Sequence, residues 1–347
     1  MIEELLTDVF SSTFKRQLVE SVYYSQAWKN LITGLYGYTL IPLTVTNSIG
    51  QITGMLPLCY LRSSLRGPRL VALPFSDHCP LLAEDDDSAN NLIDQAVWLA
   101  QQNGVRYLEL RTGVNDVLKN RTDFVESNLY ACWTTPLDAD PGVIWSRLQK
   151  SAQGKVRKSR RLGVRIRFTQ RREDMLDYYR LHLRTRSKKH GMPAQPQRFF
   201  LELWDSFAAS GNLQLLLADY EGTTIAGSIL IASGTVARFL YGASDERFLH
   251  LAPNNLIKWE AIDWCCKNGY QTLAHGRTAR DNKGLMQFNH NWAAIEKPLP
   301  YYYYPRMAGL AATSESSARY HLLTSCWKRL PLHVAGPLGG YLYKHLG

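Results

Sequence analysis

The chain has 347 residues, of which 45% are hydrophobic, and it carries 19 Tyr and 9 Trp. This length suits two domains of ordinary size, and the composition excludes a chain that is disordered throughout. The net charge of +10 favours an anionic partner such as phosphate, nucleic acid or a lipid headgroup.

The N-terminal residues MIEELLTDVF carry acids where a secretory signal would carry basic residues. No apolar run reaches the roughly 18–20 residues that a membrane-spanning helix needs. We therefore expect a cytoplasmic protein. The six cysteines form no C-x-x-C pair and have no histidine at zinc spacing, which predicts reduced packing cysteines and no metal site.

A first α/β pattern runs from Thr39 to Thr112. The stretch Thr39–Leu58 reads as strand, turn and strand, and Leu92–Thr112 reads as an amphipathic helix, an Asn-Gly stop and a strand. A hairpin predicts antiparallel pairing, whereas a strand–helix–strand step predicts a parallel neighbour. We expect a mixed sheet.

The same pattern recurs about 165–173 residues later, as the numbering of the two stretches shows. Leu213–Ala232 repeats the hairpin, and Ile257–Thr278 repeats the helix, the Asn-Gly stop and the strand. Both final strands end in Arg-Thr. Two matches in the same order indicate a duplicated α/β lobe.

Turn residues cluster between the two copies, in TTPLDADPG at Thr134–Gly142. We therefore place an N-terminal lobe at residues 1–138, a C-terminal lobe at 139–305 and a tail at 306–347. From Tyr320 onward the tail alternates Trp and Leu with basic residues, and prolines 331 and 337 are expected to break its helix. Such a segment fits peripheral membrane contact or packing against the first lobe.

Most of the positive charge lies between Arg147 and Lys189. That stretch holds sixteen Lys or Arg and three acids, a balance of +13, so the rest of the chain sums to −3. Its densest part includes Lys155, Arg157 and Lys158. These charges spread around a helix, and we consider a solvated face, an anionic donor or lipid-linked precursor, and nucleic acid as their partners.

Four ordered motifs now resemble the FemAB-type transferases of the GNAT superfamily, which act on peptidoglycan bridges or are linked to exopolysaccharide loci. They are the basic run at Leu148–Ile166, LHLRTRSKKHGMPAQPQRFF at Leu181–Phe200, YGASDERFLHLAPNNLIKWEAI at Tyr241–Ile262 and the Gly-Arg segment Gly276–Tyr304. The resemblance implies two tandem GNAT-like lobes of α/β (α+β) class, each with a mixed sheet.

The resemblance also implies transfer of an acyl or aminoacyl group from an activated ester to an amine or hydroxyl. The donor would be acyl-CoA, an acyl-carrier-protein thioester or aminoacyl-tRNA, with no permanently bound cofactor. The acceptor would be an envelope glycan or lipid-linked precursor, so an anionic membrane surface and tRNA are candidate partners. A peripheral position at the inner face of the cytoplasmic membrane is compatible with this.

This chain departs from the family pattern at three points. The usual acidic residue before Gly-Arg is Ala274, and the usual lysine after the motif phenylalanine is Asn289. The long helical arm that some tRNA users insert into the second lobe has no room. These departures leave a second hypothesis: a GNAT fold that has lost catalysis and binds anionic glycan, lipid or RNA.

Acyl transfer needs positioned reactants, a route for a proton and donors aimed at the developing oxyanion. Four residues are candidates for the catalytic work. Arg277 would clamp a phosphate or carboxylate, or pair on the surface with Asp281. Glu260 would pair with Arg277, act as a base or be solvated. His275 would accept a proton or be structural, and Tyr241 would supply a proton or pack.

Binding roles fall to residues around these four. Strand FLYGAS and the loop after it lead into a helix, so Ser244, Asn254 and Asn255 are expected to bind the donor, with Asn254 as the helix N-cap. Lys155, Arg157 and Lys158 would add to that donor site. The expected acceptor side comprises Arg184, Arg186, His190, Phe288 and Asn289, with Phe288 also readable as a packing anchor.

Overall fold

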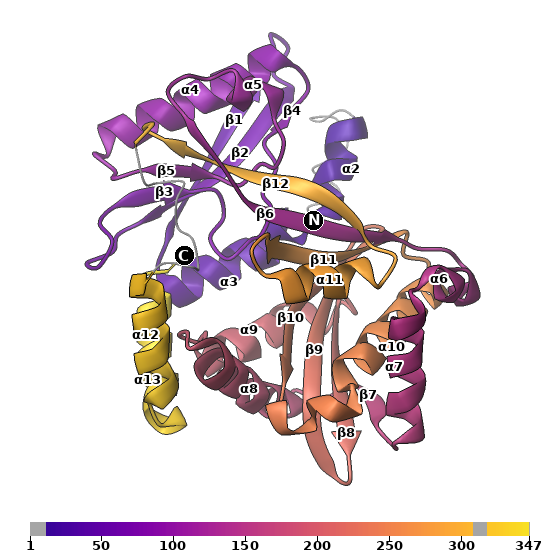
Figure 1. Cartoon of the computed structure of the whole chain (residues 1–347). Helices are drawn as coiled ribbons and strands as arrows, with labels where there is room; N and C mark the ends of the chain where they lie inside the picture. The colour runs from indigo at the N-terminus through magenta and orange to yellow at the C-terminus, as the bar shows by residue number, and fades with distance from the viewer. Residues whose placement is uncertain (1–11, 308–317, 347) are drawn as a thin grey trace. The chain divides into compact units, whose positions relative to one another are not determined.

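The computed structural model describes residues 12–307 and 318–346. The chain forms two compact units. Unit 1 draws on Met1–Ala131, Pro298–Ser314 and Lys344–Gly347, and unit 2 on Cys132–Lys297 and Glu315–Tyr343. Figure 1 labels their elements. Strands β6 and β12 therefore each pass from one unit to the other.

Unit 1 is an α/β unit with a mixed sheet in the order β1-β2-β3-β5-β12, and β4 pairs with β2. Strands β3 and β5 are parallel, and the other pairs are antiparallel. Its strands are β1 (Thr39–Thr46), β2 (Ile52–Leu61), β3 (Arg69–Val71), β4 (Leu82–Ala83), β5 (Leu108–Leu110) and parts of β6 (Val125–Pro136) and β12 (Ile295–Tyr304). Its helices are α2 (Ser12–Glu20), η1 (Val22–Tyr24), α3 (Gln26–Tyr36), α4 (Asp86–Gln102) and α5 (Asp116–Lys119).

Unit 2 has the sheet order β11-β10-β9-β8-β7, with β6 beside β11. Its strands are β7 (Arg165–Thr169), β8 (Leu213–Tyr220), β9 (Thr223–Ser233), β10 (Val236–Ser244) and β11 (Thr272–Ala279). Its helices are α6 (Pro141–Arg147), α7 (Lys150–Arg161), α8 (Asp174–Arg184), the π-helical η2 (Thr185–His190), α9 (Gln197–Phe207), η3 (Glu246–Leu251), α10 (Pro253–Lys267), α11 (Lys283–His290), α12 (Ala318–Arg329) and α13 (Leu332–Tyr343).

The predicted duplication is confirmed. In each unit an antiparallel hairpin is followed by a third strand, a helix and a strand parallel to the third. This gives β1-β2-β3-α4-β5 and β8-β9-β10-α10-β11, apart from the short β4 before α4 and η3 before α10. Both Asn-Gly stops also behave as expected, because Gly104 and Gly269 have φ of 54° and 77° directly after α4 and α10. Glycine adopts this left-handed conformation without a steric cost.

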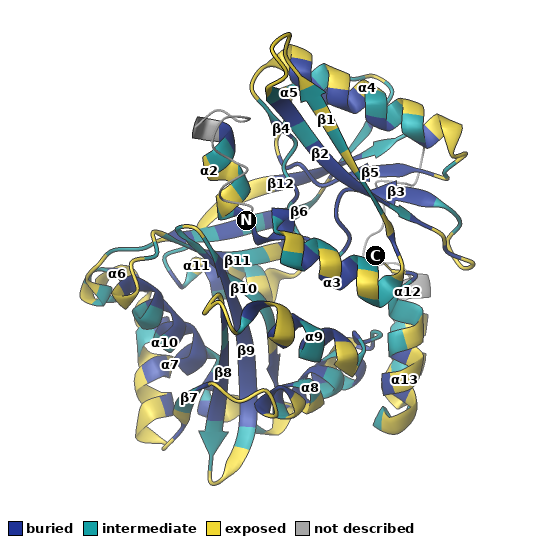
Figure 2. Ribbon diagram, turned by 180° about the vertical axis from the view of Figure 1, so that it is seen from behind, coloured by how far each residue is buried: buried dark blue, intermediate teal, exposed yellow. Residues whose placement is uncertain are grey.

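Helix α10 forms the centre of the unit 2 core. Its apolar residues surround the helix, because α7 and α6 cover one side while β8 and β9 lie against the other. The opposite face of the sheet is covered by α8, where a Cβ added at Gly227 of β9 would meet Tyr178. Figure 2 shows burial along the middle of β8 and β9, with exposed residues at the turn between them. The middle of the sheet is therefore buried on both faces.

The tail forms two helices in unit 2. Helix α12 packs against η2 and α13 against α8. The chain breaks at Pro331 as predicted, whereas the predicted break at Pro337 is wrong, because Pro337 lies inside α13. After α13 the chain joins unit 1, where the Tyr38 hydroxyl donates to Lys344 O at 2.7 Å. Nothing between residues 12–307 or 318–346 forms a helix long and apolar enough to cross a membrane.

Candidate functional site

Strands β10 and β11 separate part-way along their length. Their parallel pairing covers only Val236–Thr272, Ala237–Leu273 and Arg238–Ala274, although β10 continues to Ser244 and β11 to Ala279. Beyond this point a cavity of about 660 Å³ opens within unit 2. It is lined by Thr185, Lys189, His190, Gly227, Ser228, Phe239, Leu240, Tyr241, Gly242, Ala243, Ser244, Asn254, Ile257, Lys258, His275, Arg277, Asn282, Gly284, Leu285, Phe288 and Asn289.

A β-bulge lies in the wall of this cavity. The register of β10 against β9 pairs Phe239 with Leu230 and Tyr241 with Ile229, so Leu240 is an extra residue. A bulge leaves its extra residue outside the ladder of hydrogen bonds. Backbone amides released in this way are suitable donors to a carbonyl oxygen that gains charge during acyl transfer.

The charge of the cavity is one-sided. Lys189, Lys258 and Arg277 line it together with His190 and His275. Among the described residues of the lining, none is an Asp or a Glu. An anionic group would therefore find cations in this cavity and no carboxylate to repel it.

Lys258 of α10 is the most unusual residue of the lining, and sequence reasoning missed it. Its side chain is buried, and Nζ donates a hydrogen bond to Asn289 Oδ1 at 3.0 Å. Nζ also lies 4.6 Å from the ring centre of Phe288 and 5.4 Å from that of Trp292. Burial lowers the pKa of Lys258 well below its ordinary value. A lysine flanked by Ile257 and Trp259 was the available signal.

Asn289 replaces the lysine expected from the family pattern, and the structure shows a different lysine at its side. The amide of Asn289 is buried, accepts from Lys258 and donates to Thr278 Oγ1 at 3.2 Å. A lysine amine is therefore present beside position 289, although it comes from α10.

His275 lines the cavity at the end of the paired part of β11. Its Nε2 lies 2.8 Å from Thr135 Oγ1, whose hydroxyl also donates to Trp292 O at 3.3 Å. The hydroxyl has one hydrogen, so this arrangement favours a proton on Nε2 and a lone pair on Nδ1. Nδ1 is buried with no hydrogen-bond partner among the described residues. Burial, helped by Lys258, lowers the pKa of His275 well below 6.5.

The expected donor loop lies at the edge of the cavity. Ser244 N donates to Thr185 Oγ1 at 3.1 Å, and Asn254 Nδ2 donates to Ser244 Oγ at 3.2 Å. The prediction that Asn254 caps α10 is wrong. The helix starts at Pro253 after Ala252, whose φ is 55°, because proline suits the first helical position. Asn255 is buried inside the helix and does not line the cavity.

The remaining catalytic and acceptor candidates divide into two groups. Arg277, Tyr241 and Phe288 line the cavity. Tyr241 also packs against Phe199 and Phe200, and Phe288 lies below the amine of Lys258. His190 lines the cavity as well.

Several predicted residues lie elsewhere. Glu260 forms an ion pair with Arg160 at 2.7 Å, so its predicted pairing with Arg277 is wrong. Lys155, Arg157 and Lys158 are exposed on α7 outside the cavity, with Arg157 lying over the ring of Trp145. Arg184 and Arg186 lie outside it too. Arg186 Nε donates to Pro193 O at 3.3 Å, and Arg184 Nε lies 3.6 Å from Asp245.

The carboxylate of Asp245, the residue after β10, should make the stability of the fold depend on pH. Arg247 donates to its carboxylate at 2.7 Å, and this hydrogen bond is the largest of several influences that lower the pKa of Asp245. A carboxylate with a lowered folded-state pKa stabilises the protein above its unfolded pKa of about 3.9. This stabilisation is lost as the pH falls through the folded value.

We expect Asp245→Asn to unfold at a lower temperature than the wild type at pH 7. The gap should close as the pH falls below about 4, where the wild-type carboxylate also becomes protonated. Thermal unfolding followed by circular dichroism from pH 7 to pH 3 measures it. A gap that stays constant across this range would contradict the assignment.

The position in unit 1 that corresponds to Arg277 is occupied by Arg111, which has a different role. Arg111 matches Arg277 in the duplicated pattern, but its side chain is buried. Arg111 Nε donates to Glu109 at 2.7 Å, and its Nη1 donates to Ser76 O at 2.8 Å. Arg111 is therefore held in the interior of its unit, whereas Arg277 is exposed at a cavity.

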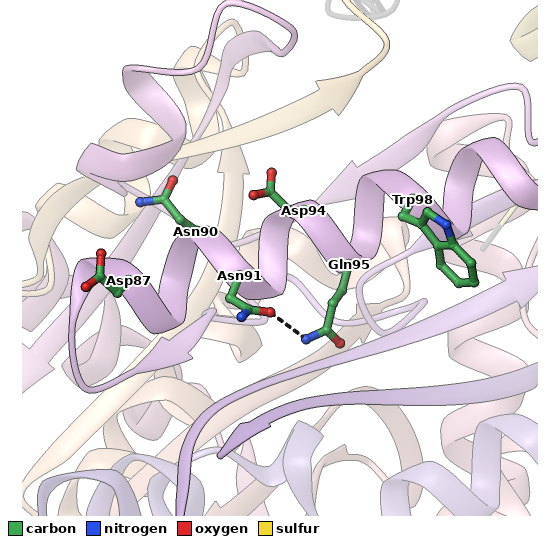
Figure 3. Close-up of a pocket in the computed structure, with 6 residues that line it drawn as sticks. All are labelled: Asp87, Asn90, Asn91, Asp94, Gln95 and Trp98. Atoms are coloured by element: carbon green, nitrogen blue, oxygen red, sulfur yellow. Dashed lines mark hydrogen bonds between the residues drawn. The ribbon is translucent and has the colours of Figure 1, made fainter. Parts of the chain in front are cut away.

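A second hollow, of about 500 Å³, lies along α4. Its six lining residues all project from this one helix (Figure 3). Asn91 and Gln95 hydrogen-bond to each other at 2.8 Å, and Asp94 pairs with Arg121 at 2.6 Å. Polar groups from different elements do not converge here as they do in unit 2, so the cavity between β10 and β11 is the better candidate site.

Known proteins resemble this chain mainly in structure. A family model described as an acetyltransferase (GNAT) domain matches residues 146–284, and no curated protein matches the sequence. FemX superposes with a TM-score of 0.63 at 15% identity, covering 82% of this chain and 91% of its own. L-PGS from Bacillus licheniformis superposes with a TM-score of 0.55 at 13% identity, covering 93% of this chain and 98% of its own. A tandem GNAT protein from the clavulanic acid biosynthesis pathway superposes with a TM-score of 0.50 at 12% identity, covering 83% of this chain and 91% of its own.

Proposed function

We propose that this chain, whose residues 146–284 match a GNAT acetyltransferase domain model and whose fold is similar to that of FemX, transfers an acyl or aminoacyl group to a cell-envelope precursor. The donor is an acyl thioester or an aminoacyl-tRNA. The acceptor is an amine or hydroxyl of a peptidoglycan, exopolysaccharide or lipid-linked precursor. The reaction takes place in the cavity of unit 2.

The observation that carries this proposal is the cavity between the separated strands β10 and β11. Acyl transfer to an amine needs a place where the carbonyl and the nucleophile meet out of bulk water. The cavity provides that place, and the bulge at Leu240 puts a residue with no partner on β9 into its wall. Donors of both proposed kinds carry phosphates, which suit the cationic lining.

Arg277 is the best candidate to hold an anionic group of a substrate. It is exposed at the cavity, and it lies directly after Gly276, whose φ is 77°. A guanidinium binds phosphate or carboxylate through two parallel hydrogen bonds, which fixes the substrate as well as attracting it.

The binding-protein hypothesis has less support. It predicts a pocket that is filled by side chains such as His275 and Phe288. Both residues line an open cavity of about 660 Å³ instead, which has room for a substrate. This favours a transferase.

The first test is donor binding. The wild-type protein is heated with acyl-CoA thioesters and with charged tRNAs, and unfolding is followed. A true donor at 100 times its Kd stabilises the fold by about 2.7 kcal/mol. The donor that stabilises the protein is then supplied with candidate precursors, and transfer is measured by mass spectrometry. Absence of both stabilisation and transfer across these donors would overturn the proposal.

The second test concerns Arg277. Arg277→Ala should reduce transfer by roughly 10-fold to 150-fold, since a hydrogen bond to a charged group contributes about 1.5–3 kcal/mol. Arg280→Ala is the matched control, because Arg280 pairs with Glu296 at 3.0 Å and does not line the cavity. If Arg277→Ala and Arg280→Ala both keep wild-type turnover, Arg277 takes no part in the reaction.

A further inference from the structure

The transfer proposed above needs a group that moves a proton. An amine that attacks a carbonyl must lose a proton, and the leaving group of the donor must gain one. Among the described residues of the cavity no carboxylate is present to do this. Glu260, the one carboxylate expected there, is paired with Arg160 outside the cavity. The titratable groups that remain are Lys258, Lys189, Tyr241 and the two histidines.

Resting on that proposed function, we infer that Lys258 is the proton carrier of the reaction. Its Nζ accepts the proton that the acceptor amine loses and returns it to the leaving group of the donor. The buried amine is held at the cavity by one hydrogen bond to Asn289 Oδ1 and by two aromatic rings.

The step balances without a further reactant. The acceptor nitrogen forms a bond to the acyl carbon, and the bond from that carbon to the donor oxygen or sulfur breaks. The neutral amine of Lys258 takes the proton from the attacking nitrogen and becomes an ammonium. The leaving oxygen or sulfur then takes this proton, which restores the neutral amine. A hydroxyl acceptor follows the same course.

The surroundings of Nζ shift its protonation equilibrium toward the neutral amine. The rings of Phe288 and Trp292 attract an ammonium, but such contacts contribute about 0.5–2 kcal/mol, and one pKa unit corresponds to about 1.4 kcal/mol. Burial opposes them and dominates, so the pKa of Lys258 is lowered well below its ordinary value. The neutral amine keeps a lone pair for a proton, whereas an exposed lysine is an ammonium at pH 7.

The other groups that face this site are less suitable. His275 and Arg277 come from β11, Tyr241 from β10, and Lys189 and His190 from η2. Burial lowers the pKa of both histidines from an ordinary value of about 6.5, which is already below neutral pH, whereas the pKa of Lys258 falls from about 10.4. Each histidine therefore holds a proton weakly at neutral pH. Lys189 is exposed, and arginine stays protonated. On the far side of α10, the Arg160–Glu260 pair is neutral overall.

The first measurement needs no substrate. The wild-type protein is labelled with trace acetic anhydride at a series of pH values, and each lysine peptide is quantified by mass spectrometry. Lys258 should reach half of its own maximum at a lower pH than Lys267, an exposed lysine of the same helix that is paired with Asp263. A midpoint shared with Lys267, or no labelling of Lys258 at any pH, would overturn the inference.

The second measurement uses a donor and acceptor identified as described above. Lys258→Met should lose transfer by about 100-fold or more. Lys258→Arg should lose it as well, because a guanidinium is not deprotonated. Lys267→Met is the matched control and should keep wild-type turnover. Donor-dependent thermal stabilisation should persist in Lys258→Met, which separates a lost proton carrier from a lost fold.

Asn289→Asp gives a reading that a purely structural role would not produce. A carboxylate beside Nζ favours the ammonium, so the pKa of Lys258 rises, and the rising limb of kcat/KM against pH should move to higher pH. An unmoved limb, or wild-type turnover in Lys258→Met, overturns the inference and leaves the transferase intact. Absence of transfer by the wild type overturns the transferase itself, whatever the labelling gives.

Discussion

Arg111→Met is expected to destabilise unit 1 by about 3–5 kcal/mol. Arg111 and Glu109 form a buried ion pair at 2.7 Å, with side chains 8% and 11% exposed. Methionine fills much of the space but leaves the Glu109 carboxylate and Ser76 O without their buried donor. An unpaired buried charge costs far more than the pair contributes.

Hydrogen exchange can locate this effect. Amides of β5 in unit 1 should lose protection, and those of β11 in unit 2 provide the comparison. The double variant Glu109→Leu with Arg111→Met should recover most of the loss, because two apolar residues remove both charges together. A double variant as unstable as Arg111→Met alone would show that the carboxylate is not the cause.

Gly191→Ala is expected to detach helix α12 from the segment Thr185–His190. Gly191 has φ of 65°, and an added Cβ would lie 2.3 Å from Thr324 O and 2.9 Å from Thr324 C. These are backbone atoms of α12, which cannot turn aside as a side chain can. The strained backbone costs about 1–2 kcal/mol and the overpacking about 1–3 kcal/mol more.

Gly269→Ala is the matched control for this change. Its φ is 77°, but nothing lies within 4 Å of an added Cβ, so only the backbone strain applies. Thermal unfolding should show a larger loss for Gly191→Ala, and limited proteolysis should cut α12 in that variant alone. Since Thr185, Lys189 and His190 line the cavity, donor binding should weaken too. Equal losses in the two variants would mean that α12 does not brace this wall.

The fold was readable because its signals are local. Each hairpin alternates over a few residues, and each helix ends at its own Asn-Gly pair, so the duplicated pattern needs no long-range information. Pro337 shows the limit. A proline usually ends a helix, yet residues packed around α13 keep it helical through this position. Asn254 shows another limit, because the sequence Pro-Asn-Asn fits a helix that begins at the proline or at the asparagine.

The site was only partly readable because it depends on residues far apart in the chain. Lys258 and Glu260 differ by about 200° around α10. Once Glu260 meets Arg160 of α7, Lys258 must face elsewhere. Which residue faces the cavity was not visible in the sequence, since the partners of Lys258 come from α11 and the turn after it. The motif resemblance placed Tyr241, Ser244, Arg277 and Asn289 at one site, and the cavity brings these four together. Their roles remain predictions.

The path of the chain through unit 1 has a consequence for its synthesis on the ribosome. Strand β5 pairs with Tyr302–Tyr304 of β12, and Arg69 donates to His345 O at 2.7 Å. Both partners are made after residues 132–297, which supply most of unit 2. At roughly 5–20 residues per second, the N-terminal half waits about 10–30 s for its last strand. The nascent chain thus holds an unfinished sheet edge while its second half emerges, and this interval is when aggregation or chaperone capture would act on it.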